Sequence, residues 1–258
     1  MNKKIRILIL ATDCETTNIV YHYLKDYLMI DRVIIEKKVD RLQLIKRRVK
    51  KLGFFTVLGQ LLFQTIIAKS LFLASRKRIK EIIEQYHLNV SPVDEKIISK
   101  VHSINEEAVI NIIKESDPDL ILVNGTRIIS KRVLNSAGKV FINTHLGITP
   151  LYRGVHGGYW ALASNDIANF GSTIHLVDPG IDTGRILYHA RALPGKSDNY
   201  ITYPYLQIAA SLPFIKKGIE DIVNGNYAVN NQTTDRSRLW YHPTIVQYFY
   251  NRWTKGIK

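Results

Sequence analysis

Short apolar segments alternate with longer amphipathic segments along most of the chain. Apolar-rich runs predict strands at residues 5–10, 32–36, 120–123, 171–177 and 185–191. Apolar residues spaced three and four positions apart predict a long helix at 199–223, and shorter helices are expected before residue 28, around 105–115 and at 158–164. Strands that alternate with helices in this way indicate an α/β, Rossmann-like, doubly wound sheet whose strands are mostly parallel.

The chain has 258 residues, of which 46% are hydrophobic, and no long linker or repeat interrupts it. We therefore expect a main domain over residues 1–223, with a helical insert at about 40–86, and an extension over residues 224–258. The apolar run near the start is short and lacks a small-residue cleavage site, so it is interpreted as a strand and not as a signal peptide. The single cysteine, Cys14, excludes an intrachain disulfide and fits a reducing compartment such as the cytoplasm.

The insert departs from the alternation of strands and helices. Its apolar run at residues 54–73 is about as long as a membrane-spanning helix requires, and basic clusters flank it at 46–51 and 76–80. Thr56, Gln60 and Gln64 recur every four residues and predict a narrow polar stripe on a broad apolar helix. Three arrangements are open: a helix packed on the core or on a partner in a homodimer, a helix lying on an anionic membrane through residues 46–80, or a membrane span.

The formal net charge of +14 indicates that the protein attracts an anionic partner, but it does not identify that partner. An excess of Lys and Arg attracts anions of several kinds, including nucleotide diphosphates, RNA and acidic lipid surfaces, because long-range electrostatic attraction is not selective. Charge by itself therefore does not choose the partner.

Candidate chemistry gathers behind two of the predicted strands. Asn143 and His145 lie two positions apart at the end of an apolar run, so their side chains project on the same side of a strand. Asp178 and Asp182 follow the strand at 171–177 in a glycine-rich loop. An amide, an imidazole and a carboxylate in one cleft could stabilise an oxyanion and transfer a proton.

Three blocks of residues carry a resemblance to a known family: Asn143-x-His145; Pro150-x-Tyr152-Arg153-Gly154; and Val177-Asp178-x-Gly180-Ile181-Asp182-Thr183-Gly184. Together they resemble the signature of the formyltransferases that use 10-formyltetrahydrofolate, over about residues 118–194. Glycinamide ribonucleotide formyltransferase, methionyl-tRNA formyltransferase and the sugar N-formyltransferases share that signature. The resemblance implies that 1–223 is a catalytic domain, that 10-formyltetrahydrofolate is the cosubstrate, and that Asn143, His145 and Asp182 are the catalytic residues.

The resemblance also implies binding residues on both sides of the reaction. The segment that lines the folate pocket in the family matches Gly125, Thr126, Arg127 and Ile129, with Val177 and Asp178 in the second loop; Arg127 could instead only bridge surface carboxylates. Tyr152, Arg153 and His156 are the candidates for contact with the acceptor, although Arg153 could equally position its loop. No metal site is expected, because His156, His175 and His189 lack the spacing of zinc ligands; His175 is interpreted as a core or supporting residue.

The choice of acceptor depends on elimination. No glycine lies between Leu10 and Leu28, where the purine enzyme of the family carries a phosphate-binding loop, and Thr16 and Thr17 are instead expected to cap the first helix. The aromatic and basic tail is too short for the tRNA-binding barrel of another branch. A nucleotide-linked amino sugar of cell-envelope polysaccharide is therefore expected. Another small or lipid-linked amine, hydrolysis of the formyl-folate, and a membrane-associated interaction protein without turnover remain as alternatives.

Overall fold

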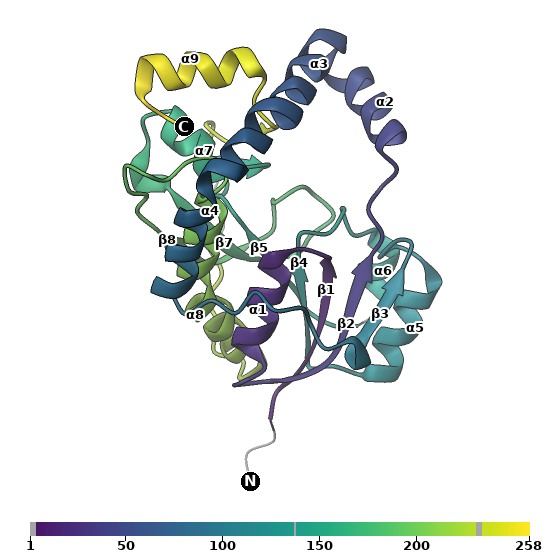
Figure 1. The fold of residues 1–258 in the computed structure, drawn as a ribbon. Coiled ribbons are helices and arrows are strands. Elements are labelled where there is room, and N and C mark those ends of the chain that lie inside the picture. Colours follow the sequence, from purple (N-terminus) through teal and green to yellow (C-terminus); the bar gives the residue numbers. More distant parts are fainter. Residues whose placement is uncertain (1–3, 137, 231–233) are drawn as a thin grey trace.

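A seven-stranded mixed sheet forms the centre of the molecule in the computed structural model, which describes residues 4–136, 138–230 and 234–258 (Figure 1). The strands are β1 (Arg6–Thr12), β2 (Met29–Glu36), β3 (Ile98–Val101), β4 (Leu120–Asn124), β5 (Phe141–His145), β7 (Gly171–Leu176) and β8 (Ile186–Arg191). Their order across the sheet is β3-β2-β1-β4-β5-β7-β8. The first five strands in that order are parallel, and β7 and β8 are antiparallel to their neighbours.

Helices cover both faces of the sheet. They are α1 (Glu15–Leu24), α2 (Arg41–Leu52), α3 (Phe54–Leu62), α4 (Ala68–Gln85), α5 (Glu107–Ser116), α6 (Lys131–Ser136), α7 (Gly157–Ala163), α8 (Tyr203–Val223) and α9 (Ile245–Lys255). Successive side chains of β1 enter two separate cores: Ile7 and Ile9 pack with α1 and α8, whereas Leu8 and Leu10 pack with α5 and α6. A strand that is covered on both faces must be apolar at every position, which explains the uninterrupted runs in the sequence.

The sequence predicted this α/β fold and its mostly parallel sheet, and the structure confirms both. Two local elements were not expected. A two-stranded parallel sheet joins β6 (Tyr152–Gly154) to β9 (Arg238–Trp240), and α6 is a short helix between β4 and β5. Each is too short to leave a periodic pattern that could be read from the sequence.

The insert forms a nearly continuous helix from α3 through a π-helical turn at Phe63–Ile67 into α4. One side packs on the domain: Val57 and Phe63 are fully buried, and the Phe63 ring lies 4.8 Å from that of Tyr200 and 5.2 Å from that of Tyr248. Farther along, Arg78 forms an ion pair of 2.8 Å with the buried Asp198. The helical segment Phe54–Gln85 is long and apolar enough to cross a membrane by length and composition, but the packed side ties both of its ends to the domain.

The polar stripe predicted on this helix faces the protein and not the solvent at its central residue. Gln60 is buried, accepts a hydrogen bond of 2.6 Å from Arg48 of α2, and donates one of 2.9 Å to the His242 carbonyl. On the other side of the helix Phe55 is 85% exposed. Here the insert therefore buries a polar side chain and exposes a large apolar one.

Packing of the insert on the domain can be tested by comparing two phenylalanines of the same helical segment. We expect Phe63→Ala to lower the free energy of unfolding by about 3 to 5 kcal/mol, because a fully buried ring leaves a cavity. Phe55→Ala is the matched control and should change the free energy by less than about 0.5 kcal/mol, because its ring is already in solvent. Urea denaturation followed by circular dichroism measures both; equal effects would mean that the packed side has been wrongly assigned.

Candidate active site

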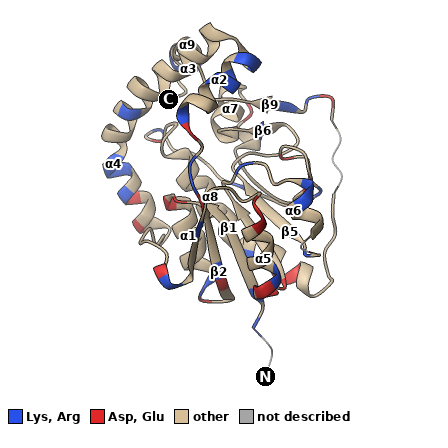
Figure 2. Ribbon diagram, turned by 90° about the vertical axis from the view of Figure 1, so that its right-hand side faces the viewer, with Lys and Arg blue, Asp and Glu red and all other residues tan. Residues whose placement is uncertain are grey.

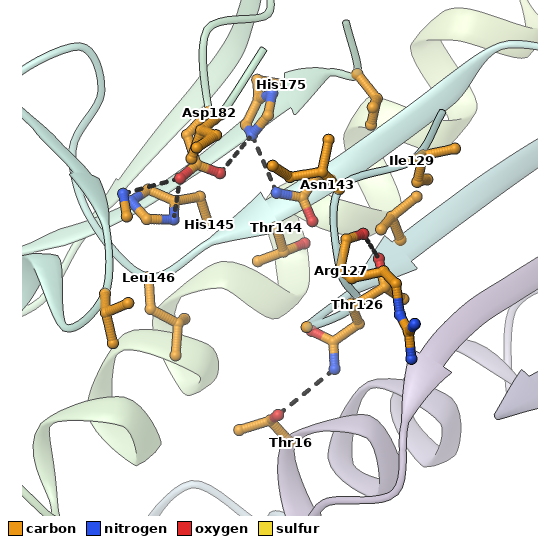
Figure 3. Close-up of a pocket in the computed structure, with 18 of the residues that line it drawn as sticks. Thr16, Thr126, Arg127, Ile129, Asn143, Thr144, His145, Leu146, His175 and Asp182 are labelled. Carbon is orange, nitrogen blue, oxygen red and sulfur yellow. Dashed lines mark hydrogen bonds and ion pairs between the residues drawn. The ribbon is translucent and has the colours of Figure 1, made fainter. Parts of the chain in front are cut away.

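A cavity of about 440 Å³ opens at the carboxyl ends of β4 and β5, where open α/β sheets bind their ligands. Its walls come from the segments after β4 and β7, from the start of α1, from the residues just before α7, and from α8. Asn143, His145, His175 and Asp182 point toward one another along one side of it (Figure 3). The cavity is within the size range of small-molecule sites.

Strand β5 supplies the first two of these side chains. Asn143 and His145 both line the cavity, as the spacing of two predicted, while Ile142 packs in the core. The Asn143 amide nitrogen lies 3.1 Å from Nε2 of His175, on the neighbouring strand β7. His175 places its Nδ1 2.8 Å from the Leu176 carbonyl, which can only accept a hydrogen bond, so Nδ1 carries a proton. In the neutral ring Nε2 then accepts from Asn143 and orients the amide.

Asp182 brings the loop between β7 and β8 back onto β5. Its Oδ2 accepts a hydrogen bond of 2.9 Å from the Gly154 N–H and lies 3.4 Å from Nδ1 of His145. Its Oδ1 lies 3.8 Å from Nε2 of His175. The loop passes so close to β7 that any Cβ on Gly184 would overlap the Leu176 carbonyl, which explains the glycine there.

Burial and charge set the protonation of this pair. Burial lowers the pKa of His145 below 6.5, and the Asp182 charge opposes that shift. Burial alone would raise the pKa of Asp182, but the His145 charge, the nearby His175 ring and the Gly154 N–H together lower it to about 2. At neutral pH the site therefore holds an ionised Asp182 beside a neutral His145.

The ring of His145 is placed to gain a proton. Its Nε2 lies 2.7 Å from the Tyr152 carbonyl, so Nε2 is the donor and Nδ1 of the neutral ring carries the lone pair. A proton added at Nδ1 would give an imidazolium bonded to a carbonyl on one side and facing a carboxylate on the other. This arrangement suits a general base.

The segment after β4 and the loop after β7 line the other wall of the cavity. Gly125, Thr126, Arg127, Ile129, Val177 and Asp178 all border it. Asp178 also braces its own loop by accepting from the Gly180 N–H at 3.0 Å and the Thr183 hydroxyl at 2.7 Å. Arg127 forms an ion pair of 2.5 Å with Glu36, a buried carboxylate.

The three residues predicted to contact the acceptor separate in the structure. His156 lines the cavity and its ring stacks 3.9 Å from that of Tyr200. Arg153 borders an adjoining cavity of about 550 Å³ that Asp182 also lines, and it donates at 3.2 Å to the Ile181 carbonyl. The Tyr152 side chain lies outside both cavities, because its hydroxyl donates at 2.8 Å to Asp166. The expectation of a direct Tyr152 contact is corrected accordingly: its carbonyl positions His145.

Other residues at the site were not identified from sequence. Gln207 lines the cavity from α8, and it had no polar signal because it falls within an apolar helical pattern. Thr16 also lines the cavity, and the prediction that it or Thr17 caps the first helix is wrong, since the residue before the helix is Cys14. Among the described residues no cluster of His, Cys, Asp or Glu could hold a metal ion.

The chain matches the family model described as "Formyl transferase" over residues 65–198, more than half of its length, so it belongs to the formyl transferase family. It is 35% identical over 86 residues to a methionyl-tRNA formyltransferase of Finegoldia magna, covering 33% of this chain and 27% of that protein. It is 29% identical over 111 residues to a GDP-perosamine N-formyltransferase of Brucella melitensis, covering 43% and 42%. The chain thus spans between about a quarter and two fifths of the length of these relatives.

Among solved structures, a sugar N-formyltransferase from Shewanella sp. has a similar fold. The TM-score is 0.56 with 16% identity, over 92% of this chain and 76% of the other. At this identity the likeness concerns the fold alone.

The coupling of His145 to Asp182 can be measured by NMR titration of the histidine rings. Because the Asp182 charge raises the pKa of His145 against the effect of burial, Asp182→Asn should lower that pKa further than in the wild type. Asp178→Asn, in the same loop but on other partners, is the control and should leave the His145 titration unchanged. An unchanged or higher His145 pKa in Asp182→Asn would contradict the proposed pairing.

Proposed function

We propose that this protein transfers a formyl group from 10-formyltetrahydrofolate to a primary amine. The observation that carries the proposal is the meeting of Asn143, His145 and Asp182 at one wall of a cavity. Family membership supports the cosubstrate, because the family uses this donor. The matched segments cover only part of each relative. The activity and substrate that we propose therefore depend on the residues of this chain.

The chemistry requires attack of an amine on the formyl carbon, stabilisation of the resulting oxyanion and removal of the amine proton. Asn143, oriented by His175, has a second amide hydrogen to donate to the oxyanion, and one such donor typically contributes about 3 kcal/mol. Neutral His145 accepts the proton at Nδ1, and Asp182 stabilises the imidazolium that forms. As the tetrahedral intermediate collapses, the bond between the formyl carbon and the folate nitrogen breaks, and the proton passes from the imidazolium to that nitrogen through a water molecule beside Asp182.

In this proposal one wall of the site binds the folate and the other binds the acceptor. Backbone and side-chain atoms at Gly125, Thr126, Arg127 and Ile129, with Val177 and Asp178, hold the folate. His156 and the adjoining cavity beside Arg153 take the acceptor. The catalytic domain spans residues 1–223, and the extension over residues 224–258 lines the adjoining cavity through Asn230, Thr234 and Ser237.

The acceptor we propose is a nucleotide-linked amino sugar for cell-envelope polysaccharide. One feature supports this choice: the turn after β1 has no glycine for a phosphate-binding loop. Similarity to a GDP-perosamine N-formyltransferase agrees with it. Arg153 supplies a guanidinium beside the cavity, which suits an anionic substrate.

Catalysis by the three residues can be tested with purified protein, 10-formyltetrahydrofolate and an accepted amine. Asn143→Ala should lower kcat by about 10² to 10³, the usual cost of losing one oxyanion donor, and His145→Ala should lower it by at least about 10². Asn111→Ala changes an exposed asparagine of α5 and should keep wild-type activity. If the two site variants matched Asn111→Ala, the catalytic assignment would be withdrawn.

The acceptor can be identified by a screen with mass detection of the formylated product. We expect formylation of one or more nucleotide-linked amino sugars, with little or no product from glycinamide ribonucleotide or methionyl-tRNA. Folate turnover that does not depend on an added amine would indicate hydrolysis instead. Preferential formylation of either control substrate would assign the protein to that branch.

A further inference from the structure

The insert exposes an apolar surface that no part of the described chain covers. We call it the insert face. Its larger members, with their exposed fractions, are Phe54 (60%), Phe55 (85%), Leu58 (41%), Leu62 (39%), Ile66 (51%), Phe72 (44%) and Leu73 (59%). Most follow at intervals of three or four residues, so they share one side of the helical segment. A continuous exposed apolar strip of this kind marks an interaction site.

The segment is apolar on its outward side as well as on its inner side. Val57 and Phe63 are buried against the domain, as is normal for a helix in water. The polar Gln60 is also buried, on Arg48 and the His242 carbonyl, while large apolar residues are exposed on the other side. Packing on the domain therefore does not account for the exposed apolar residues, which indicate that the outward side meets an apolar medium.

A second exposed apolar row adjoins the first on α9. Val246, Tyr250 and Trp253 follow at intervals of four and three residues and are 74%, 60% and 78% exposed. Helix α9 packs beside α3, with Tyr248 against Phe63, and Figure 1 shows the two helices together at one end of the molecule. Trp and Tyr are enriched at the level of lipid headgroups.

Positive charge surrounds these rows. Residues 41–80 and 236–258 contain sixteen of the 36 Lys and Arg residues and none of the 22 Asp and Glu residues. These two segments therefore carry a formal charge of +16, while the rest of the chain, with 20 basic and 22 acidic residues, carries −2. Figure 2 shows blue segments along α2 and α4. Each basic residue near an anionic bilayer adds to binding, so the charge complements acidic lipid headgroups.

We propose that the insert face, with the exposed row of α9, docks this protein on an anionic lipid bilayer. The helix lies in the plane of the interface and does not cross it: a crossing would pull Gln60 away from Arg48 and His242, and Arg78 away from Asp198. A second copy of the chain is a poorer occupant. Two such faces would bring like charges together, whereas acidic lipids neutralise them.

Vesicle flotation tests this surface without depending on the proposed enzymatic activity. The full chain should float with phosphatidylglycerol-containing vesicles and about tenfold less with pure phosphatidylcholine, and high salt should weaken the binding because it screens the headgroup charge. Phe55→Ser/Leu58→Ser/Leu62→Ser should lose at least about tenfold in binding, with its thermal unfolding unchanged. Ile167→Ser/Leu193→Ser, which removes exposed apolar residues elsewhere, is the matched control and should bind as the wild type does.

Charge is tested separately, which keeps the proposal falsifiable if the serine variant fails to fold. Lys50→Gln/Lys69→Gln/Lys77→Gln should bind acidic vesicles about tenfold more weakly, and the same change at Lys96, Lys100 and Lys114 should have little effect. Absence of flotation, or flotation equal in all variants, would overturn the proposal. If light scattering showed a dimeric wild type and a monomeric serine variant, the insert face would be assigned to contact with a second copy. Protein that floats with vesicles but does not formylate an amine would contradict the proposed enzymatic function and support the proposed membrane docking.

Discussion

The contacts of the Asp182 carboxylate hold the proposed active site together. This one group meets the imidazole of His145 from β5, the imidazole of His175 from β7 and the backbone N–H of Gly154. Burying a charge costs hydration free energy, which such partners must offset. Here each partner comes from a different segment. Together with the Arg153 hydrogen bond to the Ile181 carbonyl, these contacts fix the loops in a single arrangement. The protonation of His145 follows from that arrangement, while His175 orients the Asn143 amide.

The insert is connected to this site by a chain of polar and aromatic contacts. Arg48 bonds to Gln60, Gln60 bonds to the His242 carbonyl, and Nδ1 of His242 lies 2.9 Å from the Tyr200 hydroxyl. The Tyr200 ring then stacks on His156 at the wall of the cavity. Burial lowers the pKa of His242 to about 4 and that of His156 below 6.5, so both rings pack as neutral groups. The helical segment that we place on the membrane thus also braces the acceptor side of the proposed site.

Much of the fold could be read from the sequence because its signals are local. The alternation of apolar strands with amphipathic helices gave the α/β class, and a spacing of two placed Asn143 and His145 on one side of a strand. Pairing of β6 with β9 could not be read, since it joins residues about 85 positions apart through backbone groups that any sequence carries. The support of Asn143 by His175 depends likewise on β7 running antiparallel beside β5. The loop motif that contains Tyr152 could be recognised in the sequence, but the direction of the Tyr152 side chain toward Asp166 could not.

By itself, the order of residues determined the kind of sheet, the ends of its strands where the chemistry lies, and the presence of a long apolar helix between basic clusters. Periodicity and residue type are properties of neighbouring positions, so they can be read from the sequence alone. Only the tertiary structure decided which side of that helix is covered, and it turned Gln60 inward and Phe55 outward. The same holds for the protonation of His145 and Asp182, because burial and charge at that pair arise from segments that are distant in the chain and meet only when it folds.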